Sequence, residues 1–179
     1  MNIRDFENHS PVIDGTAFVD KSAVVIGNVS IAADVSVWPL TTIRGDIHSI
    51  SIGARSNIQD GSVLHVTHDS EYSPGGFALN IGESVTVGHK VILHACTIGN
   101  HCLVGMGSTV LDGAVLEDNV MLGANSLVSP GKRLESGYLY LGSPARQARK
   151  LTDEEMQWLE YSASHYVELK NRYKKVNKA

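Results

Sequence analysis

The 179-residue sequence has no long apolar segment, no basic and apolar N-terminal leader, and only two cysteines. The first two absences argue against a membrane-spanning helix and a cleavable export signal, so we expect a soluble, cytoplasmic protein with no membrane partner. Cys96 and Cys102 stand where the repeat described below places small residues. We interpret them as buried free thiols and not as metal ligands.

Basic clusters are also absent from the body of the sequence, and the formal net charge is −4. Proteins that bind nucleic acids concentrate positive charge on one face or element, so we expect no nucleic-acid partner. The length is sufficient for one sizeable core.

The sequence does contain an aliphatic residue at every sixth position over most of its length. The series is Val19, Val25, Ile31, Val37 and Ile43, then Ile52, Ile58 and Leu64, then Ile81, Val87 and Leu93, then Ile98, Val104, Val110, Leu116, Leu122 and Val128. This period is typical of hexapeptide β-helices, in which the large aliphatic side chains fill a coil of short strands. Three hexapeptides form one triangular coil, so residues about eighteen apart stack at about 4.8 Å. The sequence therefore predicts an all-β solenoid.

Two insertions interrupt the series. Ile43 and Ile52 are nine residues apart, and Leu64 and Ile81 are seventeen apart. We therefore expect a short excursion from the coil and a longer loop near residues 66–80.

Once the insertions are set aside, the polar residues form two outward columns. Arg44, His65 and His94 each follow an aliphatic residue by one position, whereas Asp60 and His89 follow theirs by two and lie on the preceding face. His65 and His94 are therefore expected to bind one metal ion together. In a threefold assembly, His89 of the partner subunit would complete the site. Three imidazoles with an open fourth position are the ligands of a catalytic zinc ion.

The segment Arg44-Gly45-Asp46, the pair Gln59-Asp60, His65, and His89 with His94 resemble the γ-class carbonic anhydrases, and more closely their short bacterial homologues. The resemblance covers about residues 8–170. It implies a left-handed parallel β-helix of hexapeptide repeats with a C-terminal α-helix, assembled as a homotrimer with metal sites between subunits. The handedness is implied by the resemblance alone.

The resemblance also implies an activity, the reversible hydration of CO2 to bicarbonate. The metal, Zn²⁺ or alternatively Fe²⁺ or Co²⁺, is expected on His65, His89 and His94, since imidazole ligands suit all three ions. The other implied site residues are Gln59, which hydrogen-bonds near the reacting water, Arg44 and Asp60, which form an ion pair between subunits, and Asp46, which supports Arg44 or the interface.

Two positions depart from the family. His68 occupies the place of a glutamate involved in proton transfer, and Ile47 follows Asp46 where the family has a second acidic residue. A histidine can carry protons near neutral pH, which makes His68 a candidate shuttle. Two alternatives therefore stay open: a metal-binding homologue with little or no carbonic anhydrase activity, and a hexapeptide acyltransferase that uses one histidine as a base.

The sequence divides into a repeat domain over residues 1–142 and a C-terminal turn and helix over residues 143–179. A capping box at Thr152-Asp153-Glu154-Glu155 is expected to open the helix. The apolar stripe expected to pack on the coil comprises Met156, Leu159, Ala163, Tyr166 and Val167. The basic residues expected to face solvent at the end of the helix are Lys170, Arg172, Lys174 and Lys175.

Overall fold

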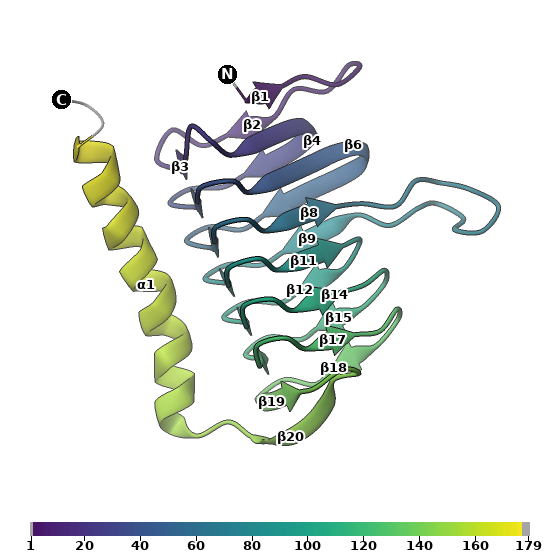
Figure 1. Ribbon diagram of the computed structural model, residues 1–179, viewed down its shortest axis with the longest axis vertical. Coiled ribbons are helices and arrows are strands. Elements are labelled where there is room, and N and C mark those ends of the chain that lie inside the picture. The colour runs from purple at the N-terminus through teal and green to yellow at the C-terminus, as the bar shows by residue number, and fades with distance from the viewer. Residues whose placement is uncertain (1, 177–179) are drawn as a thin grey trace.

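The structure, a computed structural model, describes residues 2–176. Over this range, short parallel strands stack into a solenoid and a helix runs along its side (Figure 1). The predicted fold class, an all-β solenoid of hexapeptide repeats with a C-terminal helix, is confirmed. Residue 1 and residues 177–179, at the outer ends of the two expected segments, lie outside the described residues, and the boundary between those segments stays a prediction.

The strands of residues 2–176 form two sheets. The larger sheet contains β1 (Ile3–Arg4), β2 (Val12–Ile13), β4 (Val24–Ile31), β6 (Thr42–Ile52), β8 (Val63–His65), β9 (Leu79–Ile81), β11 (Ile92–His94), β12 (Thr97–Ile98), β14 (Thr109–Val110), β15 (Val115–Leu116), β17 (Leu127–Val128) and β18 (Arg133–Leu134). The smaller sheet contains β3 (Phe18–Val19), β5 (Ser36–Val37), β7 (Asn57–Ile58), β10 (Thr86–Val87), β13 (Leu103–Val104), β16 (Met121–Leu122), β19 (Tyr138–Leu141) and β20 (Arg146–Lys150). The larger sheet covers two faces of the solenoid, because the first half of β6 pairs with β8 and the second half with β9.

The aliphatic residues of the repeat stack in the interior. Ile43, Leu64 and Leu93 are in register on β6, β8 and β11, and all three are fully buried. The preceding face is built in the same way, with Ile58 in register with Val87. These are the faces that the repeat predicted, and burial of stacked aliphatic side chains is the main favourable contribution to the stability of such a coil.

Buried serines join successive coils at the corners. The Ser62 hydroxyl donates to the Gly88 carbonyl at 3.0 Å and accepts from the Val91 amide at 3.2 Å. Within residues 2–176, every buried side-chain nitrogen or oxygen has a hydrogen-bond partner. Since an unsatisfied buried group costs about 1–3 kcal/mol, small hydroxyl side chains suit these corners.

Cys96 and Cys102 are buried free thiols, as predicted. Burial raises the pKa of both thiols, that of Cys102 to about 12. Both therefore stay protonated at neutral pH, which disfavours metal binding through sulfur.

The two insertions take different forms. The shorter one lies inside β6, whose register with β4 shifts between Gly27 and Val29. The longer one forms a hairpin that projects from the solenoid between β8 and β9, with antiparallel bridges from Thr67 to Phe77 and between two serines near the tip (Figure 1). Gly76 has a φ of 64°, and a Cβ there would lie 2.5 Å from the Thr67 carbonyl oxygen, so the hairpin requires glycine at this position.

Helix α1 (Asp153–Val176) opens with the predicted capping box. The Thr152 amide donates to the Glu155 carboxylate at 2.9 Å, and the Glu155 amide donates to the Thr152 hydroxyl at 3.2 Å. The helix then runs back along the solenoid and packs against β3, β5 and β10 (Figure 1). Trp38 lies at the centre of an aromatic cluster that joins the smaller sheet to Tyr166 and Tyr173 of the helix. In the described part of the chain, no helix is long and apolar enough to cross a membrane.

The end of α1 differs from the expectation. Lys170, expected to face solvent, is only 1% exposed; its Nζ lies 2.8 Å from the Asp34 carboxylate and donates to the Thr16 carbonyl at 3.0 Å. Leu159 and Ala163 are buried as predicted, but Met156 is 37% exposed. Lys174, also expected to face solvent, is half-buried, and its Nζ donates to the carbonyls of Gly15, Thr16 and Ala17. The expectation for Lys170 was wrong because the helix packs on the first coil, where backbone carbonyls need a donor. Its long aliphatic stem allows the ammonium group to reach them.

The Asp34→Asn variant should lower the free energy of unfolding by about 1–3 kcal/mol, because it leaves the buried Lys170 ammonium without its counter-charge. The backbone at Asp34 is left-handed, with a φ of 57°, and Asn adopts this conformation readily. The change in the free energy of unfolding therefore measures the loss of the negative charge and not backbone strain. Urea unfolding at fixed protein concentration measures the change. The double variant with Lys170→Met should recover part of the loss, and an Asp34→Asn protein as stable as the wild type would contradict the assignment.

Candidate metal centre

Two adjacent strands bring His65 and His94 together. His65 ends β8, His94 ends β11, and the two residues are paired in the parallel register of these strands. Their ring nitrogens face each other, with 3.2 Å between Nδ1 of His65 and Nε2 of His94. The structure thus places these two histidines side by side in the first column, as expected from the repeat.

Each of the two rings is held from its outer side by a carboxylate. Nε2 of His65 lies 3.0 Å from Oδ1 of Asp46, and Nδ1 of His94 lies 2.6 Å from Oδ1 of Asp112. A carboxylate can only accept, so in the neutral rings these outer nitrogens carry the protons and donate. The two inner nitrogens are then both lone-pair acceptors that face each other.

Two facing acceptors at 3.2 Å repel each other unless a proton or a metal ion lies between them. Two imidazole nitrogens on one tetrahedral zinc ion, each 2.0–2.1 Å from it, are about 3.3 Å apart. The spacing in the structure therefore fits joint binding of one metal ion. Carboxylates behind the ligating imidazoles are also the usual second layer of such sites.

The ionisation of these groups agrees with this geometry. Burial lowers the pKa of His65 below its usual value, with Arg44 acting in the same direction and Asp46 opposing it. Burial alone would raise the pKa of both carboxylates. Hydrogen bonds from Arg44 and His65 outweigh burial at Asp46, so the pKa of Asp46 is lowered. Hydrogen bonds from Thr67 and His94 do the same for the pKa of Asp112. Neutral imidazole and ionised carboxylate are the forms that metal binding requires.

Arg44 and Thr67 complete a row of six side chains along this face. The Arg44 guanidinium donates to Asp46, and the Thr67 hydroxyl donates to the second carboxylate oxygen of Asp112. The row runs from Arg44 through the carboxylates and the two facing imidazoles to Thr67. Every contact in it joins a donor to an acceptor except the central one, between the two imidazoles.

Asp112 and Thr67 were missed by the sequence reasoning. Asp112 lies eighteen residues after His94, but Leu93 pairs with Val110, so the position in register with His94 on the next coil is Leu111 and Asp112 lies one residue further along. Asp112 follows its aliphatic residue, Val110, by two positions, so it falls outside the column of His94, whose members follow theirs by one. Thr67 begins the projecting hairpin, and the repeat says nothing about the conformation of an insertion.

The second column lies apart from the first in this chain. His89 Nδ1 lies 3.0 Å from the Asp60 carboxylate, and both side chains are about half exposed, at 46% and 48%. Gln59 is buried and its amide donates to Asn57 at 3.1 Å. The expected pairing of Arg44 with Asp60 is one between subunits, and it stays a prediction.

Within residues 2–176, no three histidine, cysteine or acidic side chains gather closely enough to hold a metal ion. One chain therefore offers two facing imidazoles but no third ligand. The roles of His65, His89 and His94 as metal ligands stay predictions.

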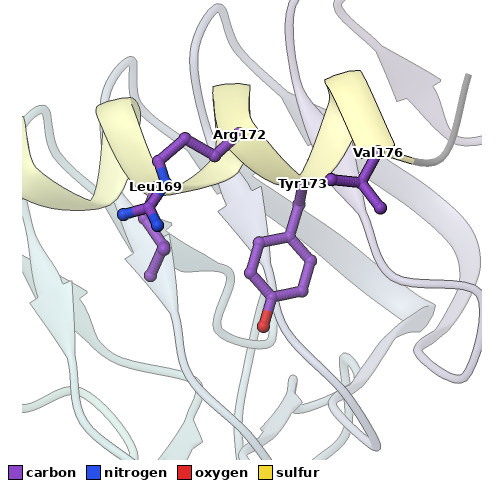
Figure 2. Close-up of a pocket in the computed structure, with 4 residues that line it drawn as sticks. All are labelled: Leu169, Arg172, Tyr173 and Val176. Carbon is purple, nitrogen blue, oxygen red and sulfur yellow. The ribbon is translucent and has the colours of Figure 1, made fainter.

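One pocket adjoins this site, and another lies near the end of α1. One of about 400 Å³ lies beside Asp46 and is also lined by His9, His48 and His68, which places the candidate shuttle next to the row of six. The other, of about 270 Å³, is lined by Leu169, Arg172, Tyr173 and Val176 near the end of α1 (Figure 2). None of the predicted site residues lines the second pocket.

Known proteins match this chain over nearly its whole length. It is 61% identical over 171 residues to Protein YrdA of Escherichia coli (strain K12), which covers 96% of this chain and 93% of that protein. It is 43% identical over 169 residues to the mitochondrial Gamma carbonic anhydrase 2 of Arabidopsis thaliana, which covers 94% of this chain and 59% of that protein. The chain belongs to the γ-class carbonic anhydrase family. The membership predicted from the motifs is thus confirmed.

The family shares its coil with other hexapeptide proteins. Residues 95–130 match the pattern described as bacterial transferase hexapeptide (six repeats). The crystal structure of a hexapeptide transferase family protein from Anaplasma phagocytophilum has a TM-score of 0.88 and 42% identity to this chain, covering 95% of this chain and 96% of that one. Family membership and fold do not by themselves identify the activity, because proteins of one fold catalyse different reactions.

Proposed function

We propose that this protein is a metal-dependent carbonic anhydrase that interconverts CO2 and bicarbonate. The observation that carries the proposal is the pair of facing acceptor nitrogens of His65 and His94, 3.2 Å apart and each backed by a carboxylate. Zn²⁺ is the ion proposed here, with Fe²⁺ and Co²⁺ as alternatives. When bound to three imidazoles, such an ion lowers the pKa of water to about 7 and so supplies a hydroxide nucleophile at neutral pH.

We propose a homotrimer, in which His89 of the partner subunit is the third ligand. Three features of the chain support this. His89 is exposed, residues 2–176 of one chain supply no third ligand to the site, and the two histidines are flanked by Val63 and Ile92, which are 42% and 44% exposed. A partner subunit on this face would cover these apolar side chains.

The other side chains bind and orient. Asp46 and Asp112 hold the rings of His65 and His94 in the tautomers that leave the inner nitrogens free. Gln59, by its resemblance to the family, hydrogen-bonds to the reacting water, whereas in the single chain its amide donates to Asn57. Arg44 donates to Asp46, which supports the proposal that Asp46 orients Arg44; a role of Asp46 at the interface is the alternative.

Proton release is the step for which the chain departs most from its family. Ile47 and His68, in place of acidic residues, line the pocket beside Asp46. Each hydration of CO2 leaves one proton that must reach solvent, and the pocket offers three imidazoles that could accept it, those of His68, His48 and His9.

Added imidazole buffer should therefore raise the CO2 hydration rate in a concentration-dependent way, measured by stopped flow on the metal-loaded protein. His68→Ala should lower the rate at low buffer and be rescued by imidazole if His68 carries the proton. His165→Ala, on helix α1, is the control and should leave the rate unchanged. A fast rate that does not depend on buffer would contradict slow proton release.

Two other functions predict different results in the same assays. A metal-binding homologue without catalysis would bind the ion but show no CO2 hydration at any buffer concentration. A hexapeptide acyltransferase would transfer an acetyl group from acetyl-coenzyme A. The match of residues 95–130 to the hexapeptide pattern supports this function as a second candidate. Metal analysis of anaerobically purified protein, followed by both assays, separates the three.

A further inference from the structure

Asp112 lies between a proposed metal ligand and the base of the projecting hairpin. Its Oδ1 accepts from Nδ1 of His94 at 2.6 Å, and its Oδ2 accepts from the Thr67 hydroxyl. Thr67 is held in turn by two backbone hydrogen bonds to Phe77 across the hairpin, of 3.1 and 2.9 Å. Both carboxylate oxygens are therefore occupied, one by the ring and one by the hairpin.

The backbone around Asp112 is fixed by both neighbouring coils. The Gly113 amide donates to the Ala95 carbonyl at 2.8 Å, directly after His94, and the Asp112 carbonyl accepts from the Gly131 amide at 2.8 Å. With its backbone and both oxygens fixed, the carboxylate has little freedom to turn away from the imidazole. Such restraint is what a group that orients a metal ligand needs.

We propose that Asp112 is the positioning residue of His94, and that Thr67 couples the hairpin to the metal site through Asp112. The inference rests on the proposed metal site of His65 and His94. Asp112 keeps the proton of the His94 ring on Nδ1, so that the Nε2 lone pair points at the ion. Thr67 fixes the carboxylate, so formation of the hairpin base and binding of the ion favour each other.

The chain contains a matched control. Asp118 also follows an aliphatic residue by two positions and also accepts hydrogen bonds from a residue eighteen positions before it. Its partner is Asn100, whose backbone nitrogen and side-chain Nδ2 lie 2.7 and 3.2 Å from the Asp118 carboxylate. Asp118→Asn removes a carboxylate from the same repeat position without touching a histidine. It therefore measures what such a loss does to the coil alone.

The first test is zinc affinity, measured by competition with a chelator in the full-length protein. Asp112→Asn should weaken binding about 10- to 100-fold, the usual range for the loss of a group behind a ligand. Thr67→Val should weaken it to a smaller extent, Thr67→Ser should restore it, and Asp118→Asn should leave it unchanged. The Thr67 variants keep the carboxylate, so they test the coupling even if Asp112→Asn folds poorly.

The second test needs no metal. In metal-free protein labelled with ¹⁵N-histidine, at alkaline pH where imidazole is neutral, His94 should be protonated on Nδ1 in the wild type and lose this preference in Asp112→Asn. An Asp112→Asn protein with unchanged tautomer and unchanged zinc affinity would overturn the inference. Absence of zinc binding in the wild type would instead overturn the proposed function, and the tautomer measurement would still decide the role of Asp112. Thr67→Val equal to wild type in affinity would overturn the coupling to the hairpin.

Discussion

His89→Ala should remove the bound metal although His65 and His94 stay in place. In the proposed trimer each site takes two imidazoles from one subunit and His89 of the partner subunit, so its loss leaves two protein ligands of three. Metal content per chain, measured after dialysis against a weak chelator, should fall from about one to near zero, because two imidazoles hold the ion far less tightly. The geometric basis is that one chain supplies no third ligand within residues 2–176.

Mixing variants tests whether the site is shared. An interface between a His89→Ala chain and a His65→Ala chain has one orientation in which all three histidines are present, so each mixed trimer regains one site. Random exchange of subunits between equal amounts of the two variants should then restore about a quarter of the metal sites. About three quarters of the trimers are mixed, and each mixed trimer has one intact site out of three. Neither variant alone should bind metal.

His101→Ala is the control for these measurements. His101 is 43% exposed, close to the 46% of His89, but its Nδ1 lies 3.1 Å from Glu160 on helix α1. Its replacement should leave the metal content unchanged. Full metal occupancy in His89→Ala, or a stable wild-type monomer with full occupancy, would contradict the shared site.

Arg44→Ala should make the trimer dissociate on dilution. We expect Arg44 to pair with Asp60 of the partner subunit, and both side chains are exposed enough in the single chain to reach another, at 43% and 48%. Loss of one member of a pair that assembly buries costs about 3 kcal/mol per interface, because the other charge is left uncompensated. This corresponds to a weakening of roughly 100-fold per interface. Sedimentation over a dilution series measures it.

Arg44 also holds Asp46 within the chain, so the experiment must separate the two contacts. Measurements on metal-free protein remove the contribution of the ion. Asp60→Ala should weaken assembly as Arg44→Ala does, and the double variant should cost less than the sum. Arg55→Ala, which removes an arginine of 44% exposure that contacts helix α1, is the control and should leave the trimer intact. An Arg44→Ala trimer that persists at low concentration would contradict the pairing.

Much of the candidate site was predictable because it follows from the repeat. Adjacent coils stack in register, so the positions of His65 and His94 relative to Leu64 and Leu93 were sufficient to put the two rings side by side. The separate column of Asp60 and His89 followed in the same way. What could not be predicted is which nitrogen of each ring faces inward, since that depends on side-chain rotation and on the carboxylates behind the rings.

The sequence by itself determined the coil, its faces and the residues on them. An aliphatic residue at every sixth position and a strand spacing of about 4.8 Å leave one register in which the aliphatic residues of the repeat stack in the interior. Only the tertiary structure decided the contacts made by segments outside the repeat. Thr67 reaches Asp112 through a hairpin, and Lys170 is buried because α1 returns to the first coil. These contacts join residues far apart in the chain through insertions and a helix, whose paths depend on packing against the finished coil and not on local pattern.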